Sequence, residues 1–157
     1  MSKPRRQEDS DLCFIKIEHP EEFPLNVDRK QVIRFFHETM KPYEDSLKDI
    51  EYSFDYLFSK EVCKGGFLML VVNKDRLAGA LLMLNTGMKG YVPENILLFV
   101  SVLPSFRGNG IGRKLVECSI AECKGDVKLH VEFDNPAKRL YERIGFTNKY
   151  AEMRFIE

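Results

Sequence analysis

Three glycines stand at alternate positions where a buried apolar run gives way to a helical pattern. The run is 96–100, I-L-L-F-V, and the glycines are Gly108, Gly110 and Gly112. Glycine lets the backbone turn sharply and leaves amide N–H groups unobstructed. The first turn of a helix adds unpaired donors and the positive end of the helix dipole. This spacing predicts a cradle for phosphate oxygens, suited to the pyrophosphate of a large cofactor.

The spacing of these glycines excludes two well-known phosphate-binding loops. The dinucleotide fingerprint G-x-G-x-x-G needs a glycine at position 113, which is Arg113, and it follows the first strand of a βαβ unit. The loop of nucleoside-triphosphate enzymes ends in G-K-S or G-K-T, whereas Gly112 is followed by R-K-L. An ordinary tight turn remains the alternative to a phosphate cradle of another type.

Hydrophobic periodicity indicates a mixed α/β sheet around this loop. Short apolar runs and alternating stretches predict strands, apolar residues at helical spacing predict helices, and Pro42 and Gly145 are stop signals. In chain order, strands first pair in an antiparallel meander and are then joined through helices, which defines the α/β class. The predicted strands are 12–17, 67–72, 77–84, 94–102, 127–133 and 149–156, and the predicted helices are 29–41, 43–58, 110–124 and 137–144.

Length and composition restrict the class of protein. With 157 residues, the chain is expected to form one domain, 12–157, behind a flexible N-terminal tail, 1–11. Its 24 basic and 24 acidic residues balance, which argues against nucleic acid as a partner. The longest apolar run, 67–72, is far shorter than the roughly 20 residues that cross a bilayer, and no apolar stretch follows the basic N-terminus. We therefore expect neither a membrane partner nor a signal peptide.

The cysteines and histidines indicate no metal site. The four cysteines form no C-x-x-C pair, and the three histidines do not complete a zinc pattern. Reduced thiols are typical of a cytoplasmic protein, and we expect that location. Both a monomer and a homodimer are compatible with the sequence.

Two motifs resemble those of the GNAT superfamily of N-acetyltransferases. Residues 102–112 read V-L-P-S-F-R-G-N-G-I-G, which is similar to the family's acetyl-CoA motif, R/Q-x-x-G-x-G/A after a V-x-P strand end. Residues 137–146 read A-K-R-L-Y-E-R-I-G-F, which is similar to its second motif, A-x-x-L-Y-E-x-x-G-F. The clear match covers 94–146. The resemblance implies the GNAT-like acyl-CoA N-acyltransferase fold, an antiparallel meander followed by β-α-β-α-β with a splayed central strand.

The resemblance also implies a cofactor and an acceptor. Acetyl-CoA would be the co-substrate, and its acetyl group would pass directly, in a ternary complex, to a primary amine of a small molecule or a protein. Loop amides would hold the pyrophosphate, and the pantetheine arm would pair with the end of the strand 94–102. The residues implied to contact the cofactor are Val100, Ser101, Val102, Arg107, Gly108, Asn109, Gly110, Ile111, Gly112, Arg113, Asp134 and Asn135.

One of these positions departs from the family pattern. The family often has asparagine seven residues before the motif tyrosine, where it contacts pantetheine, and here that residue is Asp134, followed by Asn135. Either residue could make the contact, and helix capping is the other role open to both.

The resemblance further implies catalytic residues. Tyr141 stands at the usual position of the acid that protonates the leaving thiolate, and Glu94, thirteen residues before Arg107, resembles the base of histone-type members. The strand from Glu94 to Val102 spans about 26 Å, so Glu94 would act from the acceptor side through water. His130 and Glu132 are rival bases.

A different class of function stays open. A non-catalytic acyl-CoA-binding or interaction domain on the same fold would keep the glycine loop and would need neither Tyr141 nor a base.

Overall fold

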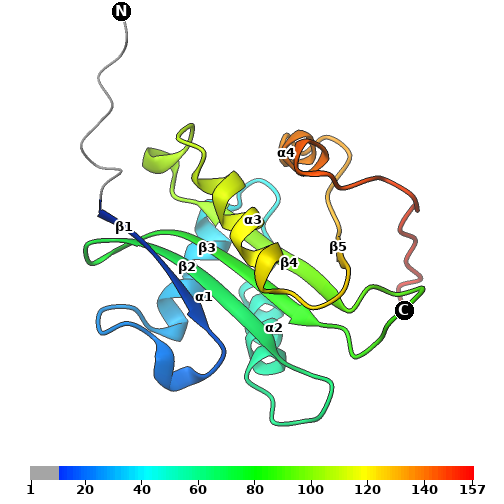
Figure 1. The fold of residues 1–157 in the computed structure, drawn as a ribbon, viewed down its shortest axis with the longest axis horizontal. Coiled ribbons are helices and arrows are strands. Elements are labelled where there is room, and N and C mark those ends of the chain that lie inside the picture. The colour runs from blue at the N-terminus through cyan, green and yellow to red at the C-terminus, as the bar shows by residue number, and fades with distance from the viewer. Residues whose placement is uncertain (1–10) are drawn as a thin grey trace, which may run out of the picture.

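The computed structural model describes residues 11–157, so the predicted N-terminal tail lies outside the described residues except for Asp11. Five strands form one sheet in the order β1-β2-β3-β4-β5 (Figure 1). Neighbours from β1 to β4 pair antiparallel, and β4 pairs with β5 in parallel. The predicted meander is confirmed. The strands are β1 (Leu12–Ile17), β2 (Gly66–Asn73), β3 (Arg76–Asn85), β4 (Asn95–Val102) and β5 (Val127–Leu129).

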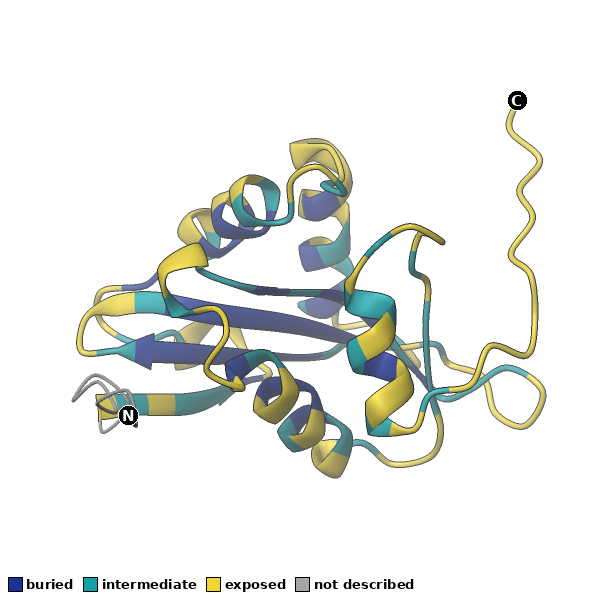
Figure 2. Cartoon of the chain, turned by 90° about the horizontal axis from the view of Figure 1, so that it is seen from above, coloured by how far each residue is buried: buried dark blue, intermediate teal, exposed yellow. Residues whose placement is uncertain are grey.

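Helices cover both faces of the sheet, as Figure 2 shows for the buried strands between them. α1 (Arg29–Thr39) and α2 (Leu47–Leu57) pack on one face, where Phe36 and Phe54 enter the core. α3 (Ile111–Glu122) packs on the other face, together with Tyr141 of α4 (Ala137–Ile144). Because β2 and β3 are covered on both sides, their sequences are nearly continuous apolar runs rather than alternating ones.

The central strand β4 separates from β5 after a few residues. β5 pairs only with Asn95, Ile96 and Leu97 of β4. On the other side, the register with β3 skips Leu98, because Met83 pairs with Leu97 and Leu82 with Phe99. An extra residue of this kind bends a strand and increases its twist. The irregularity therefore accounts for the predicted splay of the central strand.

The C-terminal part of the chain differs from the prediction. The strand expected over 127–133 ends at Leu129, and the strand expected over 149–156 does not form. The alternation of that segment is typical of a strand, but a strand needs a neighbour, and only three residues of β5 are regular. Figure 2 shows the C-terminal segment extending away from the body of the molecule, and Met153 and Phe155 are 91% and 95% exposed.

The helix bounds also needed correction. The helix expected over 43–58 begins only at Leu47, because Ser46 accepts a hydrogen bond from the Asp49 N–H and caps the helix there. No helix within residues 11–157 is long and apolar enough to span a membrane.

Candidate active site

The glycine loop between β4 and α3 depends on backbone conformation. Gly108 and Gly110 have φ of 81° and 77°, in the left-handed region that side chains disfavour. A Cβ at either position would meet nothing within 4 Å. These glycines are therefore needed for the turn itself, and the space above them is open.

The start of α3 presents amide groups without side-chain partners. Gly110 is the N-cap residue and offers no side chain to accept from the first turn, while Ile111 anchors that turn in the core. The N–H groups from Ile111 to Arg113 are thus available to an anion, and the dipole of this twelve-residue helix favours negative charge there. This is the geometry expected of a phosphate cradle.

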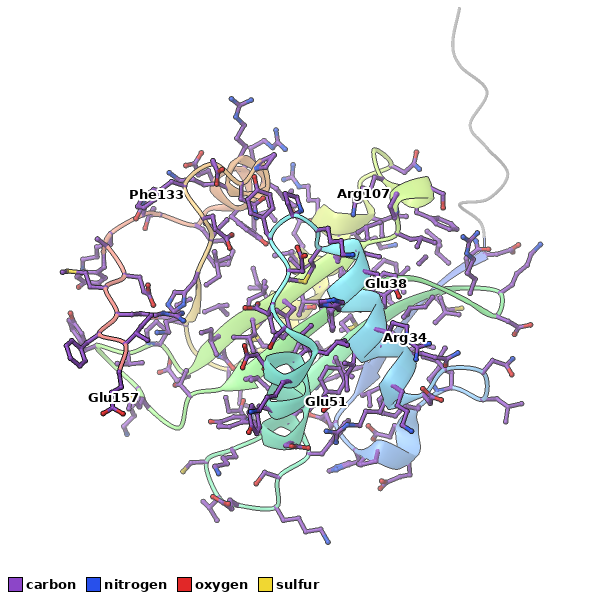
Figure 3. All side chains as sticks on the ribbon, turned by 180° about the vertical axis from the view of Figure 1, so that it is seen from behind. Arg34, Glu38, Glu51, Arg107, Phe133 and Glu157 are labelled. Atoms are coloured by element: carbon purple, nitrogen blue, oxygen red, sulfur yellow. The ribbon has the colours of Figure 1, made fainter. Side chains whose placement is uncertain are left out.

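Arg107, in the glycine loop, and Arg113, in the first turn of α3, make different contacts. Arg107 donates from Nε to the Val102 carbonyl at 2.9 Å and from Nη2 to the Thr39 carbonyl at 2.7 Å. Figure 3 shows Arg107 beside the end of α1. It ties the loop to two elements of the fold, a role that the sequence did not indicate. Arg113 is half-exposed and pairs with Glu117 at 2.8 Å, one turn along α3.

Two other loop residues make local contacts. Asn109 donates from its side chain to the Phe106 carbonyl at 3.3 Å, inside the loop. Gly112 lies beside Leu140 of α4, since a Cβ on Gly112 would fall 3.8 Å from the Leu140 side chain. The helix that carries Tyr141 therefore packs against the start of α3.

The end of β4 offers an open edge next to this loop. Val100, Ser101 and Val102 pair with β3 on one side, and no strand of the described residues pairs with them on the other. Alternate residues of a strand direct their N–H and C=O groups to each side. An extended, amide-bearing molecule can pair with such an edge.

Tyr141 is a buried phenol near this edge. It is 7% exposed and lies in the same core as Leu97 and Ile111, with the Phe146 ring edge-on at 5.8 Å. Burial, and secondarily the charge of Glu132, raise the pKa of Tyr141 to about 12. The hydroxyl therefore keeps its proton throughout the neutral range and can donate a hydrogen bond there.

Glu94 lies at the entry to β4, beside the turn that follows α3. Its carboxylate accepts the Asp126 N–H at 2.8 Å, and a Cβ on Gly125 would fall 2.5 Å from its carboxyl carbon. That backbone hydrogen bond is the main cause that lowers the pKa of Glu94. Because Gly125 follows the C-terminal end of α3, the helix, about 18 Å long, separates Glu94 from the glycine loop. The structure therefore places Glu94 at the opposite end of α3 from the glycine loop.

Asp134 and Asn135 lie in the turn before α4. The Asn135 side chain accepts the Ala137 N–H at 3.0 Å, which organises the helix start. The Asp134 backbone carbonyl accepts from the Tyr43 hydroxyl at 3.2 Å. This contact with Tyr43 joins the segment before α2 to the site, and no motif in the sequence indicates it.

Comparisons with known proteins agree with this geometry. The acetyltransferase (GNAT) domain model matches residues 64–148, more than half of the chain. The chain belongs to the GNAT acetyltransferase family, which confirms the family predicted from the two motifs. A mycothiol acetyltransferase of Actinosynnema mirum is 33% identical over 95 residues, which are 57% of this chain and 31% of that protein. The match thus spans about a third of the length of that curated relative.

Solved structures share the fold at low sequence identity. An aminoglycoside acetyltransferase from an uncultured soil sample, in complex with sisomicin, aligns with a TM-score of 0.67 at 16% identity, covering 96% of this chain and 98% of that one. The aminoglycoside N-acetyltransferase AAC(6')-Iy, in complex with CoA, aligns with a TM-score of 0.62 at 13% identity, covering 93% and 94%. At these identities the likeness confirms the fold alone.

Proposed function

We propose that this chain transfers an acetyl group from acetyl-CoA to a primary amine by direct transfer while both are bound. The proposal rests on the arrangement of three features. The uncapped start of α3, the open edge of β4 and the buried Tyr141 share one face of the sheet. Family membership supports the reaction class. The four free cysteines support the cytoplasmic location, which is part of the proposal.

The residues present fit a CoA group. Nothing lies over Gly108 and Gly110, so the pyrophosphate can reach the amides of Ile111 and its neighbours. The edge left by the separation of β4 from β5 can pair with the amides of the pantetheine arm. When bound, acetyl-CoA supplies the acetyl group as an activated thioester.

Tyr141 is proposed to act on the leaving group. Its neutral hydroxyl makes no hydrogen bond within residues 11–157. It is therefore free to donate to the sulfur as negative charge develops there. Its raised pKa keeps this donor protonated at any pH where the protein works.

The substitution Tyr141→Phe tests the proposal. We expect kcat to fall roughly 10²–10⁴-fold, the range for loss of a general acid. The Kd for acetyl-CoA should stay unchanged, because backbone groups hold the cofactor. The assay follows CoA release with a panel of amino acids, polyamines, aminoglycosides and peptide N-termini. Two structural neighbours named for aminoglycosides justify that arm of the panel.

The matched control is Tyr150→Phe, which removes an exposed phenol in the C-terminal segment and should leave kcat unchanged. If wild-type protein binds acetyl-CoA but acetylates no amine of the panel, the proposed activity is wrong. The chain is then a non-catalytic acyl-CoA-binding domain.

A further inference from the structure

The segment between α1 and α2 joins the glycine loop to the turn before α4. At its start, Arg107 donates from Nη2 to the Thr39 carbonyl at 2.7 Å. Further along, the Tyr43 hydroxyl donates to the Asp134 carbonyl at 3.2 Å. Figure 3 shows the segment lying between Arg107 and Phe133. The chain from Thr39 to Tyr43 therefore crosses from the end of β4 to the beginning of α4.

This segment belongs to the face of the sheet opposite α3. The two helices that it connects, α1 and α2, pack on one face, whereas α3 and Tyr141 pack on the other. The proposed cofactor would occupy the start of α3 and the open edge of β4. An acceptor must reach the thioester from the side that the cofactor leaves free, and the segment between α1 and α2 borders that side.

Glu44, within this segment, has a buried carboxylate oxygen without a partner. Its Oε2 is shielded from solvent and accepts no hydrogen bond within residues 11–157. Both neighbours in the chain are held in place, because Tyr43 bonds Asp134 and the Asp45 carbonyl accepts from His37 Nδ1 at 2.9 Å. Leaving a buried acceptor unpaired costs free energy, so a ligand that supplies a donor to Oε2 gains affinity.

The electrostatics of the segment favour a cation as this ligand. Burial is the largest cause that raises the pKa of Asp45, the next residue, and the charges of Asp49 and Glu132 add to it. Among the described residues, Arg154 is the one cation that acts on Asp45. Negative charge therefore predominates beside Glu44, and a charge-assisted hydrogen bond from an ammonium is stronger than one from a neutral donor.

We infer that Glu44 binds a second ammonium group of the acceptor, so that the acceptor class is a primary amine with at least two cationic groups. This inference rests on the proposed function. A carboxylate partner favours the protonated form of an amine, and a protonated nitrogen has no lone pair to attack a thioester. The group that Glu44 holds is therefore not the nitrogen that is acetylated. Glu44 positions the acceptor and takes no part in proton transfer.

The substitution Glu44→Gln tests the inference with two acceptors, a straight-chain diamine and the monoamine of equal chain length. In the wild type, the diamine should have the lower KM. Glu44→Gln should raise the KM for the diamine roughly 10–100-fold, the effect of losing a hydrogen bond to a charged group. The KM for the monoamine, and kcat for both acceptors, should stay within a few-fold of the wild type.

Thermal unfolding without ligand separates this role from a structural one. Because Oε2 has no partner within residues 11–157, Glu44→Gln removes a buried charge without breaking a bond to that atom, and Tm should stay equal or rise. A carboxylate that held the segment in place would instead lower Tm when replaced. The matched control is Glu38→Gln, which removes the same charge from an exposed position near the end of α1 and should change neither KM nor Tm (Figure 3).

The possible failures of the inference and of the proposed function differ. A Glu44→Gln variant whose KM changes equally for both acceptors, or for neither, overturns the inference and leaves the proposed function in place. A wild type with the same KM for the diamine and the monoamine does the same. A wild type that acetylates no amine of the panel overturns the proposed function, and the inference falls with it.

Discussion

The two sides of the candidate active site are built from different parts of the chain. Toward the cofactor, the available groups are backbone amides at the start of α3 and the open edge of β4. At the turn before α4, the contacts join segments far apart in sequence, because the Tyr43 hydroxyl donates to the Asp134 carbonyl. The first side is set by local conformation, whereas the second exists only once the fold has brought its parts together.

This difference explains why one side can be recognised in the sequence and the other cannot. A cradle made of amides requires glycine at positions of positive φ, such as Gly108 and Gly110, so the residues carry a visible pattern. A site made of side chains requires only that suitable residues meet in space. Tyr43, which donates to the Asp134 carbonyl, has no spacing that distinguishes it from other tyrosines.

The substitution Gly110→Val gives the strongest test that backbone conformation sets the cofactor side of the site. A β-branched residue at φ 77° is strained by about 1–3 kcal/mol, so the backbone should shift and misalign the amides of α3. We expect the Kd for acetyl-CoA to rise at least about tenfold, which corresponds to 1.4 kcal/mol. Isothermal titration calorimetry measures this change.

The matched control is Gly90→Val. Gly90 has φ 82°, and a Cβ there would also meet nothing within 4 Å, but it lies in the loop before β4, away from the cradle. Both variants should lose similar amounts of stability, and only Gly110→Val should lose affinity. Equal affinity losses in the two variants would refute a cradle made by the α3 amides.

The sequence predicted the sheet well where strands pair locally. β1 forms over 12–17 as predicted, and β2, β3 and β4 lie within one residue of their predicted bounds, because hairpin partners follow each other along the chain. The prediction was wrong for 149–156, whose alternation is real but whose pairing requires a distant, long edge that β5 does not offer. Periodicity reports which face of a strand is apolar, not whether a neighbour exists.

The sequence indicated some parts of the candidate site and not others, again because only local patterns are visible in it. Gly112, at the start of α3, lies beside Leu140, the neighbour of Tyr141 in α4. The bonds of Arg107 to the Val102 and Thr39 carbonyls, and the contact of Tyr43 with Asp134, depend on packing between separate elements. No spacing rule encodes those distances.

A smaller effect distinguishes the two arginines of the loop. Arg107→Ala removes a cation that bonds two backbone carbonyls, so we expect a loss of about 1–3 kcal/mol in the free energy of unfolding. Arg113→Ala removes an exposed ion pair and should change stability by less than about 1 kcal/mol, while weakening acetyl-CoA binding in a salt-dependent manner. Urea unfolding and calorimetry at two salt concentrations measure both. An Arg107→Ala variant of unchanged stability would show that the charge serves the cofactor after all.

The smallest expected effect concerns Glu94→Gln, which separates a structural carboxylate from a catalytic one. The pKa of Glu94 is lowered in the folded protein, chiefly by the Asp126 N–H, so its contribution to stability is present above its unfolded pKa of about 4.5 and is lost as pH falls through the folded value. We therefore expect Glu94→Gln to lower Tm at pH 7, and the difference from wild type to vanish at acid pH. The kcat at pH 7 should stay within a few-fold of wild type. If Glu94→Gln instead lowers kcat at pH 7 roughly 10²-fold or more with an unchanged Tm, Glu94 acts as the general base and the acceptor reaches the entry to β4.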